Sequence, residues 1–395
     1  MNIVWLTPEI PYPPIGGRNG VYHRIIQLSK YNTIYLFSIV YTEKEKLLGE
    51  EMKKYCKCVH YYNRNKQFLF TLIKSIVNPY SVASRTRYEL KRDLKRLLKK
   101  ENIDIFIVDF PNMAKNLMGI VDSRYYCTLN QHNIEFRRMR NMSEVKTLPI
   151  YKRLAYYLES IRLESYENKI YNSDIFKSIT FFSKDDMILF KKRWPNSNAK
   201  LKVIPLGANN NLNIIEKAFT HNLLFVGRLD DIAIPNVEAV LWFVKQVFPI
   251  IRNNVHDAKV IIAGANPSDK ITALQNEFVK IIPNYKNFED VYSLSDIVIL
   301  PLLSGGGVKG KLLEAASFRK IIISTDHGIE GTDFEAGKHV LLGNTVHEFA
   351  QKCISVLNNI TDNYIIADNA YSLFSKKYDW NMIGLTYNEF LKCQI

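Results

Sequence analysis

Three consecutive glycines separate an apolar run from a helical pattern in the second half of the chain. The apolar run predicts a buried strand over residues 297–300, and the pattern that follows predicts a helix over 308–319. Backbone N–H groups, the positive end of the helix dipole and two ammonium groups would then point at one spot. We therefore predict an anion-binding site. Its candidate residues are Gly305, Gly306, Gly307, Lys309 and Lys311.

The same segment shares part of its spacing with the phosphate-binding loop of nucleoside triphosphatases. The match is Gly305, four residues, Gly310 and Lys311. The next residue is Leu312, however, which has no hydroxyl group to bind Mg²⁺. The spacing therefore argues against a triphosphatase and leaves the anion site to be explained in another way.

Two further charged residues accompany the glycines. Glu314 lies inside the predicted helix, where its carboxylate could accept hydrogen bonds from vicinal ribose hydroxyls. Arg228 follows a strand predicted over 222–226, and its guanidinium could bind a diphosphate with two hydrogen bonds. Each residue also has a simpler interpretation, because Glu314 could pair with Lys311 at i,i+3 and Arg228 could form a surface ion pair. Taken together, they indicate a site for a diphosphate and a ribose.

Alternating strands and helices must position these residues. Parallel strands joined by helices bind ligands at their carboxyl ends, so the pattern predicts two α/β domains that face each other across a cleft. The turn-forming residues at 203–211 mark the boundary between domains 1–207 and 208–375, and residues 376–395 are expected to form a C-terminal helix that packs back on the first domain. The other predicted strands are 2–6, 33–39, 103–109, 179–182, 259–263, 279–282 and 321–324, and the other helices are 19–30, 151–171, 236–252, 268–276, 287–294 and 345–358.

The positive charge is concentrated in the first half of the chain. Residues 1–210 hold 36 Lys and Arg against 19 Asp and Glu, whereas residues 211–395 hold 17 against 20. The densest stretch, 74–100, carries leucines at helical spacing and predicts a basic amphipathic helix. It is either a solvated outer face or a surface that meets an anionic membrane or acceptor. Nucleic acid is disfavoured because no recognition motif is present. The basic residues of the predicted helix are Lys91, Arg92, Lys95, Arg96, Lys99 and Lys100.

The motifs of the second half resemble those of family 4 of the retaining glycosyltransferases, in its triple-glycine form. The resemblance covers nearly the whole chain and implies the GT-B architecture, in which two Rossmann-like domains face each other. Where the commoner family motif has the first of two glutamates, this chain has Gly306. The segments that carry the resemblance are 225–228, 235–243, 304–316 and 324–331 in the second domain, and 11–17 and 131–135 in the first.

The resemblance also implies roles for individual residues. Glu314 would hold the ribose, Arg228 and Lys311 the diphosphate, and the backbone near Asn284 and Tyr285 the base. His132 would contact the sugar or the diphosphate, with a buried structural histidine as the alternative. Completing the implied donor site are Gly16, Gly17, Gly306, Gly307, Val308 and Lys309.

The function implied is transfer of a hexose from a UDP or GDP sugar to a glycan or lipid-linked acceptor, with retention, in polysaccharide or glycoconjugate synthesis. The alternatives are a GT-B epimerase or phosphorylase and a non-enzymatic basic lipid-binding protein. No Asp-x-Asp pair occurs, so we expect no metal and no further cofactor. Because no signal-peptide pattern or spanning apolar run is evident, we expect a cytoplasmic protein that is peripheral on the inner face of the cell membrane.

Overall fold

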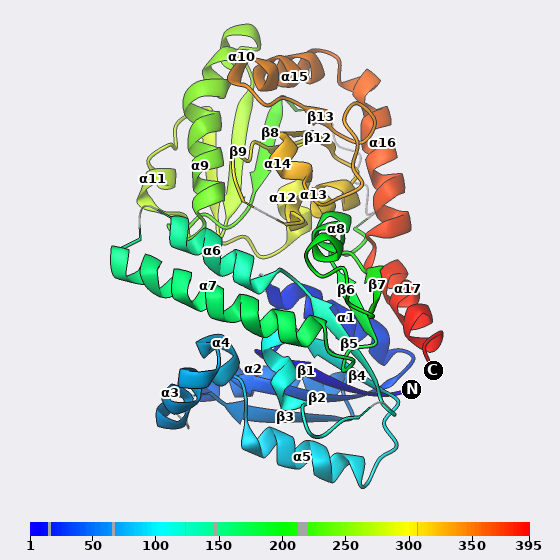
Figure 1. Cartoon of the computed structure of the whole chain (residues 1–395). Helices are drawn as coiled ribbons and strands as arrows, with labels where there is room; N and C mark the ends of the chain where they lie inside the picture. The colour runs from blue at the N-terminus through cyan, green and yellow to red at the C-terminus, as the bar shows by residue number, and fades with distance from the viewer. Residues whose placement is uncertain (15–16, 65–67, 123, 146–147, 212–219, 306) are drawn as a thin grey trace. The chain divides into compact units, whose positions relative to one another are not determined.

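A computed structural model describes the chain except for residues 15–16, 65–67, 123, 146–147, 212–219 and 306. The chain forms two compact units (Figure 1). Met1–Pro205 and Ile383–Ile395 make the first unit, and Leu206–Met382 makes the second. The division falls between Pro205 and Leu206, whereas the sequence places it after residue 207, and the second unit extends past residue 375 to Met382. The end of the chain belongs to the first unit.

The first unit is built on a parallel sheet of seven strands in the order β3-β2-β1-β4-β5-β6-β7. Both faces of the central strands are buried, as the continuous apolar runs require. Because the strands are parallel, the residues after β1, β4 and β5 meet at one edge. The strands are β1 (Asn2–Thr7), β2 (Thr33–Val40), β3 (Cys58–Asn63), β4 (Ile105–Asp109), β5 (Tyr126–Gln131), β6 (Ser178–Phe181) and β7 (Lys200–Val203).

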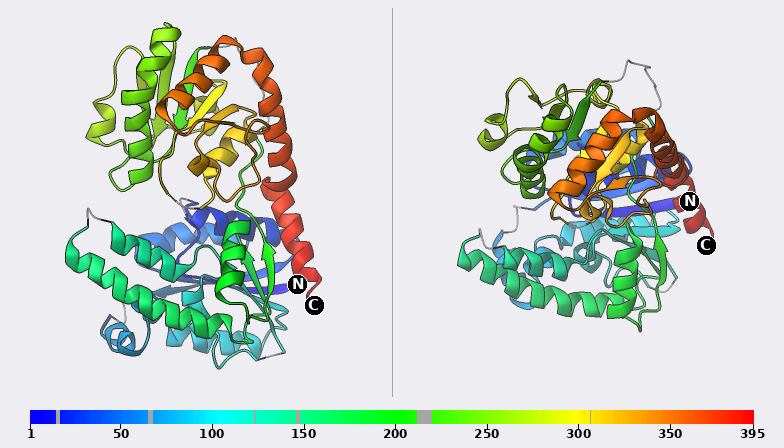
Figure 2. Two further views of the ribbon diagram at one scale, coloured as in Figure 1. Left: turned by 45° about the horizontal axis from the view of Figure 1, so that its top comes forward. Right: turned by 90° about the horizontal axis from the view of Figure 1, so that it is seen from above.

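Helices cover the first sheet and connect its strands (Figures 1 and 2). The long helix α7 pairs with α6 in a helical hairpin, and α17 carries the end of the chain. The helices are α1 (Gly17–Ser29), α2 (Glu43–Gly49), η1 (Glu50–Lys54), α3 (Phe68–Val77), α4 (Tyr80–Ala83), α5 (Tyr88–Leu98), η3 (Pro111–Asn116), α6 (Glu135–Glu144), α7 (Ile150–Tyr171), α8 (Lys184–Arg193) and α17 (Trp380–Lys392).

The second unit repeats the arrangement with six parallel strands in the order β10-β9-β8-β11-β12-β13. Counted from the first strand of each unit, both sheets contain the order 3-2-1-4-5-6, which is that of a dinucleotide-binding Rossmann fold. The strands are β8 (Asn222–Val226), β9 (Lys259–Gly264), β10 (Val279–Pro283), β11 (Ile297–Leu300), β12 (Ile321–Ser324) and β13 (Leu341–Leu342).

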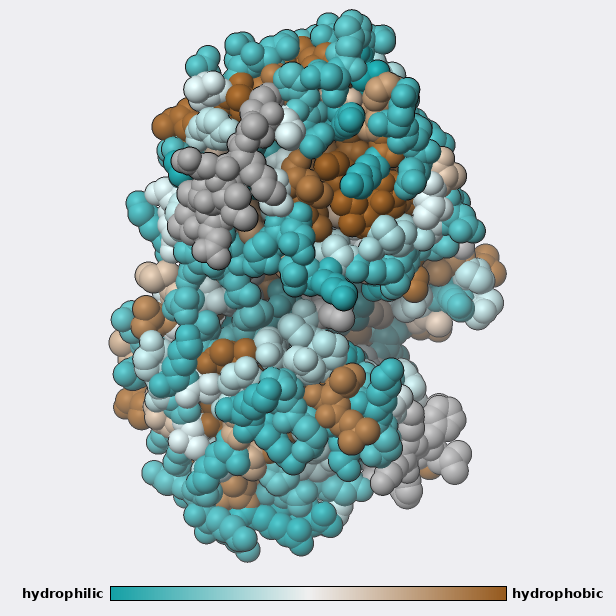
Figure 3. Space-filling model, turned by 180° about the vertical axis from the view of Figure 1, so that it is seen from behind, coloured by the Kyte–Doolittle hydropathy of each residue, from teal (hydrophilic) through white to brown (hydrophobic). Residues whose placement is uncertain are grey.

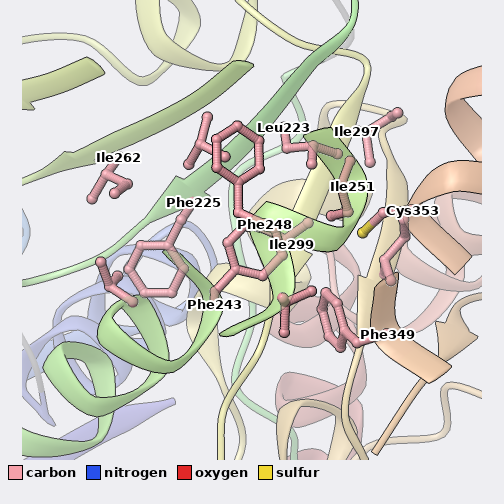
Figure 4. Packing of buried hydrophobic residues seen from close by; sticks show 14 of the residues in the cluster. Leu223, Phe225, Phe243, Phe248, Ile251, Ile262, Ile297, Ile299, Phe349 and Cys353 are labelled. Carbon is pink, nitrogen blue, oxygen red and sulfur yellow. The ribbon is translucent and has the colours of Figure 1, made fainter. Parts of the chain in front are cut away.

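One face of the second sheet packs against phenylalanines of η4, α10 and α15 (Figure 4). Phe243 contacts the rings of Phe248 and Phe349, and all three belong to the same cluster as Phe225 of β8. This core holds β8 and β11 in place, so that both strands end at a fixed point. The helices of the unit are α9 (Ile234–Trp242), the π-helical η4 (Phe243–Val247), α10 (Phe248–Asn254), α11 (Asp269–Thr272), α12 (Phe288–Tyr292), α13 (Gly310–Ser317), α14 (Asp326–Ile329), α15 (Val346–Asn358) and α16 (Ile360–Lys377).

The basic stretch 74–100 is wrongly predicted as one helix. Pro79 and the extended Arg87 interrupt it, so α3, α4 and α5 are separate, and only Tyr88–Leu98 carries the leucine stripe. The helix expected over 268–276 is likewise a single turn, α11. The edge strands β3, β7 and β13 and the buried strand β5 are not among the strands that the apolar pattern predicts.

One helical segment of the described chain is long and apolar enough to cross a membrane by length and composition. It is Ile234–Asn254, which comprises α9, η4 and α10. Val240, Phe243 and Ile251 of this segment belong to the core of the second unit. The segment therefore serves as a core helix in this structure.

Candidate functional site

The glycine turn between β11 and α13 requires glycine at two positions. Gly305 has a φ of +99° and Gly307 a φ of +77°, in the left-handed region where side chains are strained. Gly306 lies outside the described residues. The Lys309 ammonium closes the turn by donating to the carbonyl oxygens of Gly305, at 2.8 Å, and Gly307, at 2.6 Å. Partial burial lowers the pKa of this lysine. Lys309 therefore holds the shape of the turn.

Helix α13 begins directly after this turn. In the described part of the chain, its N-cap residue is Lys309, whose side chain makes no capping hydrogen bond. The positive end of the α13 dipole therefore stands at the carboxyl edge of the second sheet, where backbone N–H groups can meet an anion.

Lys311 lies in the first turn of α13 and is linked to the end of β8. Its Nζ donates to Oδ1 of Asn236 at 2.5 Å, and Nδ2 of Asn236 donates to the carbonyl oxygen of Arg228 at 2.9 Å. The ammonium also lies 4.5 Å from the centre of the Phe225 ring. A side chain at Gly227 would have its Cβ only 3.0 Å from this ammonium. The glycine therefore makes room for the lysine.

Among the residues that the structure describes, the Lys311 ammonium has no carboxylate hydrogen-bonded to it. Removal from water lowers its pKa to about 7, although the charge of Glu314 acts in the opposite direction. A diphosphate bound beside it would restore the charged form. Lys311 is therefore suited to bind an anion, because a negative charge beside it would stabilise its protonated form.

Glu314 lies one turn further along α13 and faces an aromatic side chain of α12. Its Oε2 accepts a hydrogen bond from the Tyr292 hydroxyl at 3.3 Å. Burial raises the pKa of the Glu314 carboxyl, while the Tyr292 hydroxyl and Lys311 act to lower it. The hydrogen bond from Tyr292 thus favours a carboxylate held across to α12 over the simple i,i+3 ion pair with Lys311. A carboxylate so placed retains acceptors for a second hydroxyl-bearing group.

Arg228 lies at the carboxyl end of β8 with its side chain 54% exposed. Its Nε donates to Oδ2 of Asp230 at 2.5 Å, so the simpler interpretation, a surface ion pair, describes it in this structure. Asp230 also accepts a hydrogen bond from the backbone N–H of Ala233 at 3.1 Å. The other N–H groups of the Arg228 guanidinium can still donate hydrogen bonds to a diphosphate.

Asn284 and Tyr285 follow β10 at the same edge. Asn284 has a φ of +50°, donates its N–H to Gly264 at 2.9 Å and accepts the N–H of Asn266 at 2.9 Å. Burial, with the charge of Glu314, raises the pKa of the Tyr285 hydroxyl. Gly264 allows the ends of β8 and β9 to approach, because a Cβ there would lie 1.8 Å from the carbonyl oxygen of Gly227.

His132 follows β5 at the carboxyl edge of the first sheet and is buried. Its Nε2 lies 3.1 Å from Oδ1 of Asp109, the last residue of β4. The ring stacks on Phe110 with centroids 4.1 Å apart and meets Phe182 edge-on. A carboxylate beside Nε2 favours the tautomer that carries its proton there, which leaves Nδ1 as an acceptor.

Asp109 is itself held by the elements around it. Trp5 donates its Nε1–H to Oδ2 at 2.5 Å, and Asn130 donates its amide to Oδ1 at 3.0 Å. The Tyr387 hydroxyl of α17 donates to Oδ1 of Asn130 at 2.6 Å. A chain of hydrogen bonds therefore connects the C-terminal helix to His132 within the first unit.

Gly16 and Gly17 are the two glycines of the first unit that the sequence assigns to the donor site. Gly16 lies outside the described residues. Gly17 is the first residue of α1, is exposed and has open space around the position of a Cβ. Its role in binding stays a prediction.

Of the predicted residues, the structure brings Arg228, Lys311 and Glu314 together around α13. It adds residues that the sequence did not single out. At the edge of the second sheet, Asn236 accepts a hydrogen bond from Lys311, and Tyr292 donates one to Glu314. In the first unit, Asp109 and Tyr387 belong to the hydrogen-bond chain that reaches His132. A charged residue at the end of the apolar run 103–109 was the signal for Asp109, and an asparagine after a proline in the segment 235–243 was the signal for Asn236.

Within the described residues, no group of three or more His, Cys, Asp or Glu side chains could hold a metal ion.

The chain is similar to known glycosyltransferases in sequence and fold. Residues 220–359 match the family described as glycosyl transferases group 1. A relative is the uncharacterized 44.6 kDa protein in the cps region of Klebsiella pneumoniae, 28% identical over 96% of each chain.

Solved structures of similar fold include a glycosyltransferase from Rickettsia africae, with a TM-score of 0.65 and 16% identity over 99% of this chain and 97% of that one. Another is Anabaena Alr3699/HepE in complex with UDP, with a TM-score of 0.64 and 13% identity over 100% of both chains. The chain therefore has the two-domain, Rossmann-like GT-B fold, and its second unit carries the similarity that supports a glycosyltransferase.

Proposed function

We propose that the protein transfers a hexose from a nucleoside diphosphate sugar, with UDP or GDP as the nucleotide, to a glycan or a lipid-linked acceptor. The observation that carries the proposal is the cluster at the uncapped start of α13. There, Lys311 is bound through Asn236 to the end of β8, and Glu314 is held by Tyr292. The Anabaena relative in fold was crystallised with UDP-glucose as well as with UDP, which supports a donor of this class.

In this proposal, the α13 dipole, Lys311 and Arg228 bind the diphosphate, and Glu314 binds the ribose hydroxyls. Asn284 and Tyr285 lie beside the base, and the backbone of the turn from Gly307 to Lys309 faces the phosphates. The bond between the anomeric carbon and the β-phosphate oxygen breaks while the acceptor oxygen bonds to that carbon. The proton of the acceptor hydroxyl passes to the departing phosphate, and the fixed positive groups stabilise the charge that develops on the diphosphate.

The proposal includes retention of the anomeric configuration without a divalent metal, through attack on the face from which the diphosphate leaves. His132 positions the donor sugar through its Nδ1 lone pair and is not required as a base, and Gly16 and Gly17 approach the sugar and phosphate. The cps-region relative supports a role in cell-surface polysaccharide synthesis, and the proposal places this activity at the cytoplasmic side of the membrane. The alternative within the same fold is an epimerase or a phosphorylase.

A transfer assay distinguishes these possibilities. Incubation with UDP- and GDP-hexoses and an acceptor extract should release the nucleoside diphosphate and form a glycoside, with or without excess EDTA. NMR of the purified product should show the anomer of the donor. Conversion of the donor sugar without transfer would favour the epimerase, and release of a sugar phosphate on addition of inorganic phosphate would favour the phosphorylase. Loss of turnover in EDTA that Mg²⁺ or Mn²⁺ restores would contradict the metal-free mechanism.

A further inference from the structure

The N-terminal half of α7 exposes a continuous row of large apolar side chains. Apart from the adjacent pairs Ile150–Tyr151 and Tyr157–Leu158, successive members of the row lie three or four positions apart, so they share one face of the helix. Their exposed fractions run from 41% for Tyr157 to 80% for Ile150. A row of this length is unusual on a water-facing helix, where apolar residues are normally scattered. The row consists of Ile150, Tyr151, Leu154, Tyr157, Leu158 and Ile161.

Helix α3 and the start of α4 lie next to α7 and continue this surface. Arg162 of α7 donates to the carbonyl oxygens of Ile76, at 3.0 Å, and Asn78, at 2.9 Å. The Glu159 carboxylate accepts the backbone N–H of Tyr80 at 3.0 Å. The two elements are therefore fixed to each other, and Figures 1 and 2 show them on the same side of the first unit. The exposed apolar residues added are Ile73, Ile76, Val77 and Tyr80. We call the ten residues together the α3–α7 face.

Positive charge surrounds the α3–α7 face. Residues 68–80 and 148–162 carry Lys74, Lys152, Arg153 and Arg162 against the single carboxylate of Glu159. That carboxylate is already bound to backbone N–H groups of α4. From α6, the Arg140 guanidinium lies 4.6 Å from the centre of the Tyr157 ring. An apolar surface with cations and tyrosines at its margin has the composition of an interfacial membrane-binding element.

Helix α5, which the sequence marks as a membrane-binding candidate, differs from this face. Its Leu90 and Leu94 are buried in the core, and its outward residues, apart from the exposed Tyr88, are charged. It can attract an anionic surface electrostatically but has no apolar row to insert. Figure 3 shows that hydrophilic residues also cover most of the reverse side of the chain.

We propose that the α3–α7 face binds an anionic lipid bilayer and places the first unit at the membrane surface. The apolar row inserts among the headgroups while the surrounding cations meet lipid phosphates. A second copy of the chain is disfavoured as the occupant because the like charges of two such faces would repel. The proposal deepens the proposed function, in that it brings the enzyme to a lipid-linked acceptor.

Vesicle sedimentation of the full chain tests this proposal. Parent protein should bind phosphatidylglycerol-containing vesicles well above neutral phosphatidylcholine vesicles at low salt, and high salt should weaken the binding. Leu154→Glu with Leu158→Glu should lower the partition coefficient at least tenfold, because two inserted apolar side chains become charged. Both leucines are exposed, so the fold should tolerate the change. Ile188→Glu, at an exposed isoleucine of α8, is the matched control and should bind as the parent does.

Three results would overturn the proposal. The double variant could pellet like the parent, or Ile188→Glu could weaken binding equally. Sedimentation velocity could also show a dimer of the parent that the double variant abolishes, which would assign the face to a second copy. Calorimetric titration with UDP and GDP, run on the same proteins, keeps the proposed function separate. Vesicle binding without nucleotide binding would contradict the proposed function and leave the membrane face supported.

Discussion

The carboxyl edges of the two sheets share one strand order but are built in different ways. In the second unit, the edge carries an uncapped helix start, a glycine turn and the half-exposed Arg228. In the first unit, the edge carries His132 buried between Phe110 and Phe182, with Asp109 beside its Nε2. The edge of the second unit gathers backbone N–H groups with the cations Arg228, Lys309 and Lys311, and the edge of the first unit has a histidine whose hydrogen-bonding partner is already in place.

This difference indicates a division of labour between the units. Backbone N–H groups and a lysine such as Lys311, whose described hydrogen bond is to the Asn236 amide, are suited to receive a diphosphate, whose arrival supplies negative charge. A buried hydrogen-bond chain is suited to keep one ring in one tautomer and one orientation. We therefore expect changes in the second unit to alter nucleotide affinity, and changes behind His132 to alter turnover.

The largest effect should come from Asp109→Asn. The amide can donate to Nε2 of His132, which would move the ring proton to Nδ1 and remove the acceptor that the proposed function requires there. We expect kcat to fall about 100-fold, equivalent to about 2.7 kcal/mol, while nucleotide Kd stays within about twofold of the parent. Steady-state kinetics and nitrogen-15 NMR of the histidine tautomer measure the two effects.

Asp93→Asn is the matched control, because the described partners of Asp93 are Arg92 and Arg96 of α5 and the Tyr62 hydroxyl. It should leave both kcat and the tautomer unchanged. An Asp109→Asn protein with parental kcat, or with the His132 proton still on Nε2, would refute the positioning role.

The second effect in size concerns Lys311→Met. Methionine keeps the length of the side chain but removes the charge, so we expect the Kd for UDP or GDP to rise roughly 10- to 100-fold, as for loss of a charged hydrogen bond. Because the partly buried ammonium no longer has to be desolvated, the thermal midpoint of the free protein should rise. Lys338→Met, at an exposed lysine, should change neither quantity. A parental Kd for Lys311→Met would remove this lysine from the site.

The pH dependence of binding should be smaller but diagnostic. The pKa of Lys311 is about 7 in the free protein, and a bound diphosphate raises it. Proton uptake therefore accompanies binding above pH 7, so affinity should fall as the pH rises from 7 to 9, by at most about tenfold for each pH unit. Calorimetry in buffers of different ionisation enthalpy measures this uptake. Lys311→Met should abolish it, and an equal slope in that variant would assign the proton to another group.

The smallest effect is expected for Tyr387→Phe. The hydroxyl is linked to His132 by hydrogen bonds through Asn130 and Asp109, so we expect kcat to fall about threefold to tenfold and the nucleotide Kd to be unchanged. Tyr166→Phe removes a buried hydroxyl that binds the Pro111 carbonyl instead, and it should keep parental kcat. A similar loss in both variants would show a general effect on stability.

Much of the fold follows from periodic apolar runs and turn-forming residues. Strands such as 222–226 and 321–324 are continuous apolar segments, and the structure has them at the predicted bounds. Strand β5 was missed because Asn130 and Gln131 make its end polar, although both side chains are buried against other parts of the unit. Hydrogen bonds from distant residues, here Tyr387 and Thr180, allow that burial, and no local pattern reveals them.

The candidate site divides in the same way. Gly305, Gly307, Lys309, Lys311 and Glu314 lie within ten residues of one another, so their spacing alone indicates an anion site. Asn236 and Tyr292 join it from separate helices, and their contacts depend on tertiary packing. The interruption of the basic stretch by Pro79 could be read locally, since proline disfavours a helical residue before it.

The central claim is that the start of α13 binds the diphosphate and ribose of a nucleotide. Calorimetric titration of UDP and GDP into the parent, Glu314→Gln and Tyr292→Phe proteins tests it most directly. We expect one of the two nucleotides to bind the parent with a 1:1 stoichiometry. Glu314→Gln should weaken it by about 1.5 to 3 kcal/mol through loss of the charged ribose acceptor, whereas Tyr292→Phe should have a smaller effect. Absence of binding by either nucleotide, or identical binding by parent and Glu314→Gln, would contradict the account.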